Sequence, residues 1–374
     1  MKICHIINSL GNGGAEKNLV RLSLNQIKNN KVIIITLKKK NFFYKILKKK
    51  KIKIFSLDLK FNFQIFKKIF YLLNIIKKEK PNIIFSWMFH SALIASFIAK
   101  IYNIKLFWCI RHGNFILFKS KILTIIIAKF ILPILSSIPF KIVYNSNFSR
   151  KYYEDLGYRK KKSRVIYNGY SKEYFKPNKF LKKKFIKKYK IKNNHIILGY
   201  VARFSPQKNH IFLLDCLSFI KKKYDINFKL VLVGNNVQNN QRLLNLINKF
   251  DLKKETIILK ETNKINLVYP IFDINVLVSS YGESFPNTLA ESMLCGIPCI
   301  SSQVGDSKYI IGKTGFTFKQ NDKKSFIKYL IIFKKKFFKT NKINHLTNNC
   351  RSRILTLFNL SDKIKKYNKL YSVL

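Results

Sequence analysis

Residues 279–300 read SSYGESFPNTLAESMLCGIPCI, and this stretch is the most informative part of the chain about its fold. The apolar run 273–278 before it predicts a buried parallel strand, and residues 299–302 predict the next one. Between the two, residues 284–287 (Ser-Phe-Pro-Asn) are of the types that begin a helix, whereas residues 296–298 (Gly-Ile-Pro) are of the types that end one. The stretch therefore predicts a strand, a loop, a helix and a second strand.

Two carboxylates have fixed places in this unit: Glu283 in the loop and Glu291 between one and two turns into the helix. The start of a helix offers unpaired backbone N–H groups and the positive end of its dipole, which suit a phosphate. Carboxylates accept hydrogen bonds from hydroxyl groups, which sugars and ribose carry in number. The combination predicts a nucleotide-sugar site. The alternative is a solvated Glu291 on an amphipathic helix, and spacing alone does not decide between the two.

The segment from Glu283 to Pro298 resembles the glutamate-pair signature of the retaining GT-B glycosyltransferases of family 4, with seven residues between Glu283 and Glu291. The resemblance implies an enzyme that transfers a sugar from a nucleotide-sugar donor. It also implies that Glu283 orients the transferred sugar and Glu291 the ribose. The other donor contacts that it implies in this segment are Ser284, Phe285, Asn287 and Thr288.

Composition bounds the possible functions. The 374 residues are enough for two domains, and 47% hydrophobic content can bury a core. Lys and Arg number 73 against 17 Asp and Glu, a net charge of +56, which would suit a polyanion-binding or nucleic-acid-binding protein. Lys, Asn, Ile and Phe are inflated together, however, and the Lys runs are dispersed with no nucleic-acid-binding pattern. We therefore favour compositional bias as the origin of a charge that would still attract anionic lipid.

Cysteines and apolar segments give weaker signals. Six Cys are spread thinly, mostly in apolar runs, and predict buried free thiols rather than a zinc site. The first apolar run is too short for a signal peptide. The longest one, Ile122 to Ile138, is interrupted by Lys129 and Pro133, so we expect a buried or membrane-lying helix and no transmembrane span.

Along the chain, short apolar runs alternate with helical patterns, which predicts parallel sheets in an α/β fold. The predicted strands are 3–7, 31–36, 52–57, 82–86, 105–110, 141–145, 196–201, 229–233, 256–259, 274–278 and the one at Ile300. The pattern breaks near Asn168 and resumes at His195. We predict two Rossmann-like domains facing a central cleft, the GT-B architecture. Residues 1–168 form the acceptor-side domain, 169–358 bind the donor, and a helix over 359–374 crosses back to the first domain, as the resemblance implies.

Three further segments follow predicted strands and resemble donor-binding segments of the same family. Gly13 and Gly14 lie in a glycine-rich turn after the first strand, where the backbone can approach an anion closely. Arg203 and Lys208 follow the first strand of the second domain, and the resemblance implies that they hold the donor phosphates. A solvated basic loop is the alternative. Gly234 lies in a turn that resembles the one beside the donor base, although Asn replaces the usual glycine and acid after it.

Two histidines also follow strands of the first domain. His90 is the predicted sugar-contacting residue, and Arg111 with His112 is predicted to lie on the acceptor side. A structural role for each histidine is the alternative. We predict that Glu283, His90, Arg203 and Lys208 form the catalytic set.

The nine Asp residues include no Asp-x-Asp pair, the pattern that would hold a divalent metal at a nucleotide diphosphate, so we expect no metal or other cofactor. The resulting hypothesis is a retaining glycosyltransferase with a UDP-sugar donor. Its acceptor would be a saccharide or a polyprenyl-linked saccharide of cell-envelope polysaccharide or lipopolysaccharide biosynthesis. It would lie in the cytoplasm, peripheral to the anionic inner face of the membrane. A nucleotide-sugar 2-epimerase and a polyanion-binding protein are the alternatives.

Overall fold

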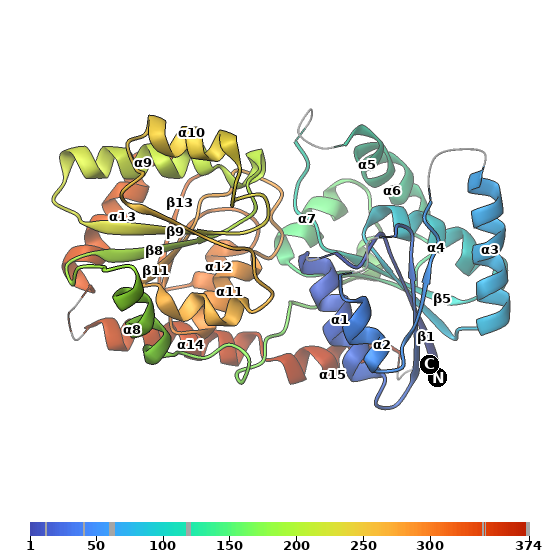
Figure 1. The fold of residues 1–374 in the computed structure, drawn as a ribbon. Coiled ribbons are helices and arrows are strands. Elements are labelled where there is room, and N and C mark those ends of the chain that lie inside the picture. Colours follow the sequence, from blue (N-terminus) through green and yellow to red (C-terminus); the bar gives the residue numbers. More distant parts are fainter. Residues whose placement is uncertain are drawn as a thin grey trace. The chain divides into compact units, whose positions relative to one another are not determined.

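The computed structural model describes residues 1–11, 13–39, 42–59, 64–116, 121–338, 340 and 342–371. It divides the chain into two compact units (Figure 1). Unit 1 comprises Met1–Asn168 and Ile364–Leu374, and unit 2 comprises Gly169–Lys363. The C-terminal segment that belongs to unit 1 thus begins at Ile364, whereas the sequence analysis placed its start at residue 359.

Unit 1 is built on a seven-stranded parallel sheet with the order β3-β2-β1-β4-β5-β6-β7. Its strands are β1 (Lys2–Ile7), β2 (Lys31–Thr36), β3 (Lys53–Ser56), β4 (Ile83–Trp87), β5 (Lys105–Ile110), β6 (Lys141–Tyr144) and β7 (Ser163–Val165). The strand interiors are apolar on both faces, as expected of a parallel sheet covered on both sides. The order reverses between β1 and β4, which pair directly.

Helices cover both faces of this sheet. α1 (Gly14–Gln26), α2 (Tyr44–Lys49) and the C-terminal Tyr367 and Tyr371 pack on one face. The other face carries α3 (Gln64–Glu79), α4 (Phe89–Tyr102), α5 (Ile122–Ile126), a π-helical turn (Ile127–Ile131), α6 (Leu132–Leu135) and α7 (Asn147–Asp155). Pro133 lacks an N–H and would clash with the carbonyl four residues earlier in a regular helix, which accounts for the widened turn before it.

Unit 2 repeats the plan with a six-stranded parallel sheet in the order β10-β9-β8-β11-β12-β13. Its strands are β8 (Ile196–Val201), β9 (Phe228–Val233), β10 (Thr256–Leu259), β11 (Ile274–Leu277), β12 (Cys299–Ser302) and β13 (Phe316–Phe318). The helices are α8 (Lys179–Lys188), α9 (His210–Lys223), α10 (Gln241–Lys249), α11 (Asn287–Leu294), α12 (Ser307–Ile311), α13 (Lys323–Lys336) and α14 (Lys342–Leu357). In Figure 1, α9 and α10 lie on one side of the strands and α8 and α11 on the other. The prediction of two Rossmann-like parallel-sheet domains is confirmed, and the cleft between them stays a prediction.

Local sequence explains where helices begin and end. Among the described residues, the side chains that accept a backbone N–H at a helix start include those of Ser146, Asn178, Asn240 and Asp322. The helix predicted in residues 279–300 is α11, and it ends as its Gly-Ile-Pro sequence indicates. Gly296 is left-handed with φ of 79°, and the N–H groups of Gly296 and Ile297 return to the carbonyls of Met293 and Ser292.

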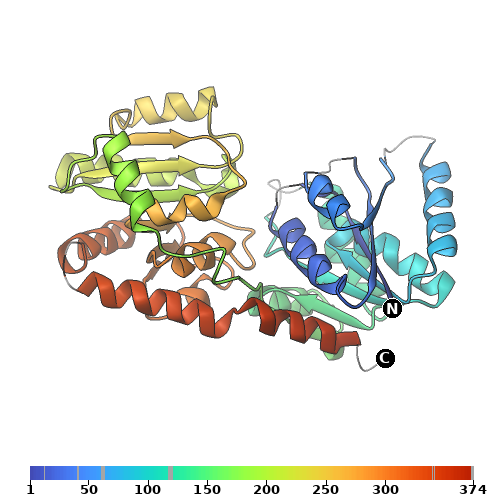
Figure 2. The same ribbon diagram turned by 60° about the horizontal axis from the view of Figure 1, so that its bottom comes forward.

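The chain's last helix, α15 (Leu360–Tyr371), follows α14 directly, as the two red helices of Figure 2 show. Within unit 1, Tyr367 and Tyr371 pack edge-on against Phe85. Tyr371 also closes a buried chain of polar groups: Trp87 donates to His5 Nδ1 at 3.1 Å, and His5 Nε2 bonds Gln26 Oε1 at 2.8 Å. Gln26 reaches the Tyr371 hydroxyl at 3.5 Å. Burial lowers the pKa of His5 to about 4, so its imidazole is neutral at physiological pH.

Two expectations about apolar segments and cysteines can be compared with the structure. Within the described ranges, none of the helices is both long enough and apolar enough to cross a bilayer. All six cysteines fall in those ranges, and each is buried and free of a disulfide, as predicted.

Candidate active site

The topology of unit 2 marks one place for a ligand. In open parallel sheets, ligands bind beyond the carboxyl ends of the strands, where the strand order reverses. Here that place lies beyond β8 and β11, which pair with each other. The loop after β8 carries Arg203 and Lys208, and the loop after β11 carries Glu283. The fold therefore brings together three residues that the sequence analysis selected separately.

A partly buried ion pair joins the two loops. Lys208 Nζ donates to Glu283 Oε1, with side-chain exposures of 17% and 11%. Ser279 Oγ donates to the same carboxylate oxygen at 2.9 Å. Burial alone would raise the pKa of Glu283, but Lys208 and Ser279, with the more distant Arg203, outweigh it and hold that pKa below its ordinary value. Glu283 is thus a carboxylate that is ionised and fixed in position.

A backbone hydrogen bond also links the two loops: the Ser280 N–H donates to the Gln207 carbonyl at 2.9 Å. Within the loop after β8, Arg203 Nη2 donates to Gln207 Oε1 at 3.0 Å. Arg203 is itself exposed, so its guanidinium can still reach a ligand. The hydroxyl of buried Tyr200 donates to the Lys208 carbonyl beneath the pair.

Two glycines allow neighbouring loops to approach this corner. A Cβ on Gly305 would lie 2.3 Å from the Ser284 carbonyl oxygen, and the residue has φ of 52°. A Cβ on Gly234 would lie 2.2 Å from the Ala202 carbonyl oxygen. Gly234 therefore allows the loop after β9 to pack closely against the segment that carries Arg203 and Lys208, whether or not a nucleotide base binds beside it.

The second glutamate, Glu291, is held by a tyrosine that precedes β11. Glu291 is 4% exposed, and fully buried Tyr269 donates its hydroxyl to Glu291 Oε2 at 3.0 Å. Burial and the nearby Glu291 carboxylate raise the pKa of Tyr269 well above its ordinary value, so Tyr269 remains a donor. The solvated alternative for Glu291 is therefore wrong.

The other predicted donor contacts in the α11 segment are partly occupied by contacts within unit 2. Phe285 is buried between Tyr170 and Phe358, with ring centroids 6.3 and 5.0 Å away. Asn287 accepts a hydrogen bond from the Tyr170 hydroxyl. Ser284 is buried, and Thr288 is half-buried. Pro286 occupies the N-cap position of α11, and it has no side-chain oxygen to cap the helix. The start of α11 can therefore receive an anion through its backbone N–H groups.

In unit 1 the predicted residues also lie beyond the carboxyl ends of the strands. Gly13 caps α1 and Gly14 begins it, after β1, and His90 is the second residue of α4, after neighbouring β4. Met88, between β4 and α4, has φ of 70° and ψ of −179°, a strained conformation for a residue with a side chain. Burial lowers the pKa of half-buried His90, and Lys38 and Lys121 add to the effect.

Arg111 and His112 have contacts inside unit 1. Arg111 donates to Asn168 Oδ1 at 2.6 Å and to the Tyr367 hydroxyl, and it lies over the Trp87 ring at 5.2 Å. These contacts give Arg111 a role in attaching the C-terminal segment. His112 stacks on Phe115 at 4.4 Å. Acceptor contact by this pair stays a prediction.

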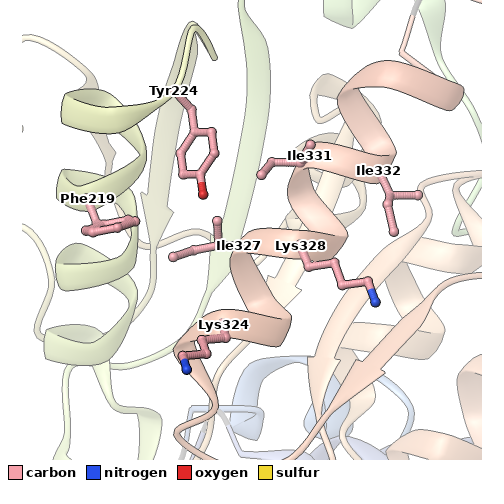
Figure 3. Close-up of a pocket in the computed structure, with 7 residues that line it drawn as sticks. All are labelled: Phe219, Tyr224, Lys324, Ile327, Lys328, Ile331 and Ile332. Atoms are coloured by element: carbon pink, nitrogen blue, oxygen red, sulfur yellow. The ribbon is translucent and has the colours of Figure 1, made fainter.

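A shallow groove of about 370 Å³ lies elsewhere on unit 2, between α9 and α13 (Figure 3). Its lining is mostly apolar and includes Phe219, Tyr224 and Ile327, together with Lys324 and Lys328. Phe219 lies nine residues along α9 from His210, which begins that helix at the carboxyl edge of the sheet. The groove is therefore well separated from the Lys208–Glu283 pair, since a helix rises 1.5 Å per residue.

Family models match both units. Residues 182–352 match the model for "Glycosyl transferases group 1", and residues 12–174 match "Glycosyltransferase Family 4". The chain belongs to the GT-B glycosyltransferases of group 1. Membership of this family favours sugar transfer over the epimerase and polyanion-binding alternatives.

Individual relatives agree with the family. The chain is 30% identical over 213 residues to a UDP-Gal:α-D-GlcNAc-diphosphoundecaprenol α-1,3-galactosyltransferase of Escherichia coli, a match that covers 55% of this chain and 53% of that enzyme. It therefore spans about half the length of that relative. It is 28% identical to the capsular polysaccharide biosynthesis glycosyltransferase CapH of Staphylococcus aureus, over 83% of each chain. Among solved structures, Anabaena HepE in complex with UDP and glucose has the same fold, with a TM-score of 0.86, 17% identity and full coverage of both chains.

Sequence reasoning missed the residues that hold these carboxylates. Ser279 lies four residues before Glu283 in the same loop, so its hydroxyl could have been considered from the loop sequence. Gln207, which bonds Arg203 and Ser280 rather than a carboxylate, was also missed, although it stands directly beside Lys208. Tyr269 precedes β11 in a short 3-10 turn, and no spacing rule links it to Glu291. Among the described residues, no group of three or more His, Cys, Asp or Glu side chains could hold a metal ion.

Proposed function

We propose that this glycosyltransferase takes its sugar from a UDP-sugar, retains the anomeric configuration and needs no metal. The observation that carries the proposal is the Lys208–Glu283 pair at the reversal point of the unit 2 sheet. A fixed cation and a fixed carboxylate at one point match the two halves of a nucleotide sugar, a diphosphate and a polyhydroxyl group.

Each residue has a part in this proposal. Arg203, Lys208 and the start of α11 would neutralise the diphosphate, in the ground state and as charge develops on it. A bound diphosphate would compete with Glu283 for Lys208, which would release Glu283 to accept hydrogen bonds from sugar hydroxyls. Glu291, oriented by Tyr269, would accept from the ribose. His90 is the proposed sugar contact from unit 1.

The proposed reaction proceeds on one face of the sugar. The bond between the anomeric carbon and the diphosphate oxygen breaks, and UDP leaves with the electron pair. The acceptor hydroxyl oxygen attacks the same face, and its proton passes to the departing phosphate oxygen. This route uses no protein nucleophile, in keeping with a Glu283 carboxylate that would accept hydrogen bonds from Ser279 and from the sugar hydroxyls.

The acceptor that we propose is a saccharide linked to a polyprenyl diphosphate, at the inner face of the cytoplasmic membrane. Two relatives support this proposal: the E. coli galactosyltransferase and a Campylobacter jejuni N-acetylgalactosaminyltransferase are both named for undecaprenol-linked acceptors. CapH supports a place in cell-envelope polysaccharide assembly. The HepE complexes with UDP support the choice of base.

Calorimetry with UDP tests the site. Arg203→Ala and Lys208→Ala should each weaken UDP binding by about 1.5–3 kcal/mol, the value of a hydrogen bond to a charged group. Lys249→Ala, at the exposed end of α10, is the matched control and should leave UDP affinity unchanged. Unchanged affinity in the first two variants would contradict the site.

Two further measurements test the chemistry. Transfer from UDP-sugars should continue at full rate in EDTA, and loss of turnover there would contradict metal independence. Proton NMR of the product should show the anomeric configuration of the donor, and the inverted product would contradict retention.

A further inference from the structure

The outer surface of unit 1 carries exposed apolar side chains that packing does not explain. Of the 24 exposed large hydrophobic side chains in the described residues, 11 lie on three helical segments: α3, α4 and Ile122–Leu135. Single exposed apolar residues are ordinary on protein surfaces, but a concentration on one helical layer marks an interaction site. We call the side of these segments that points away from the sheet the outer apolar face.

The Ile122–Leu135 segment shows the pattern most clearly. Ile122, Ile126, Phe130 and Ile134 recur every four residues and are 72%, 41%, 65% and 79% exposed. The residues on the opposite side of the same segment, such as Ala128 and Leu132, are completely buried in the core of unit 1. The segment is thus apolar on both sides, which a helix that meets only water on its outer side would not be.

The neighbouring helices extend this surface. α4 contacts the π-helical turn and α6, and the Tyr102 hydroxyl near its end donates to the Leu73 carbonyl of α3 at 3.3 Å. On α4, Phe97 and Ile101 are 57% and 65% exposed, and on α3, Phe66 and Phe70 are 75% and 66% exposed. All three segments cover the same face of the sheet, so their outward sides form one surface.

The charges on this surface are of one sign. The three segments include six lysines: Lys67, Lys68, Lys77, Lys78, Lys100 and Lys129. Their single acidic residue is Glu79, which is buried and paired with Lys2 and Lys53 at 3.0 Å each. A second copy of the chain docked on this face would bring lysines against lysines. An anionic lipid surface instead offers headgroup charge to the lysines and an acyl boundary to the apolar side chains.

We infer that the outer apolar face docks unit 1 onto an anionic membrane, with Phe130 and Ile134 entering the headgroup boundary. The inference rests on the proposed function, because membrane docking serves an enzyme whose acceptor is lipid-linked. Such an acceptor stays in the bilayer, so an enzyme held at the surface meets it by lateral diffusion. The face itself was found from exposure and charge in unit 1, independently of the donor site in unit 2.

The test is flotation of the full-length chain with vesicles of phosphatidylglycerol and phosphatidylcholine, compared with vesicles of phosphatidylcholine alone. Phe130→Ser/Ile134→Ser should bind the anionic vesicles at least about tenfold more weakly than the wild-type chain. Phe180→Ser is the matched control, because Phe180 is 72% exposed on lysine-rich α8 of unit 2, and its binding should stay within about twofold of wild type. UDP affinity of the double variant, measured in parallel, should be unchanged.

Three results would overturn the inference. The wild-type chain could fail to float with anionic vesicles. The double variant could float as well as wild type, in which case the net charge alone accounts for binding. Sedimentation without vesicles could show a dimer that the double substitution abolishes, which would make a second copy the occupant. In each of these cases, unchanged UDP affinity would show that the proposed donor site is still supported. Conversely, if the Arg203 and Lys208 variants bound UDP as wild type does, the donor site would be contradicted but the membrane face would not.

Discussion

Replacing Lys208 by methionine should destabilise unit 2 by about 3 kcal/mol. The Lys208 and Glu283 side chains are 17% and 11% exposed, so neither charge is well hydrated in the folded chain. Removing one partner of a buried ion pair leaves the other charge uncompensated and costs about 3–5 kcal/mol. Ser279 would still donate to Glu283 at 2.9 Å, which places the expected loss at the lower end of that range.

A double-mutant cycle measures the interaction energy between Lys208 and Glu283 more directly than either single substitution. Glu283→Gln alone should cost about 2 kcal/mol, because the flexible stem of Lys208 lets its ammonium move toward water. The double variant Lys208→Met/Glu283→Gln removes both charges and should cost about 2–3 kcal/mol, less than its two single changes together. The coupling energy expected from this cycle is therefore about 2–3 kcal/mol.

The assay is urea unfolding followed by far-ultraviolet circular dichroism. Tryptophan fluorescence would follow the wrong unit, because Trp87 and Trp108 are the chain's two tryptophans and both lie in unit 1. Lys323→Met serves as the control, since its pair with Asp215 is 34% and 45% exposed and should contribute less than about 1 kcal/mol. Additive losses within about 0.5 kcal/mol in the Lys208–Glu283 cycle would refute the reasoning.

Two other predictions concern backbone geometry and pH. Gly305→Ala should destabilise unit 2 by at least about 2 kcal/mol in the same unfolding assay, because its Cβ would lie 2.3 Å from a backbone oxygen at positive φ. Gly157→Ala, whose nearest neighbour is a side-chain atom at 3.6 Å, should cost less, and equal losses would contradict the close approach at Gly305. Stability should be full above about pH 6.5 and fall toward pH 4. Burial lowers the pKa of His5 and His210 to about 4, so the unfolded chain, with ordinary values near 6.5, takes up protons first. Melting temperatures at pH 7, 6 and 5 should therefore decline less steeply in His210→Phe than in exposed His345→Ala, and parallel declines would contradict that account.

Most strands could be predicted because buried parallel strands are continuous apolar runs. The predicted bounds of β2, β5, β8 and β10 match those of the structure. The strands that were missed, β7 and β13, have three residues each and lie at sheet edges, where a run is too short to show a pattern. Edge strands take their conformation from pairing with a neighbour, which a local sequence does not record.

The candidate site residues were selected one by one from the sequence, whereas the interactions among them were not predicted. Sequence motifs selected Lys208 and Glu283 as separate ligand contacts, and their mutual ion pair arises only because β8 and β11 are neighbours in the sheet. Phe285 stands in the same motif, yet the structure packs it against Tyr170 and Phe358, so part of the motif serves the loop's shape. Arg111 follows a strand as a ligand contact would, but it bonds Asn168 and also Tyr367, which lies 256 residues further along the chain.

The discontinuity of unit 1 has a consequence for biosynthesis. The ribosome synthesises Met1–Asn168 before unit 2. It adds Tyr367 and Tyr371, which cover Phe85 and complete the His5 and Arg111 networks, only after unit 2. During translation Phe85 therefore lacks these two tyrosines while unit 2 is synthesised, which takes about 10–40 s at 5–20 residues per second. Unit 1 therefore reaches its final stability only after unit 2 has been synthesised.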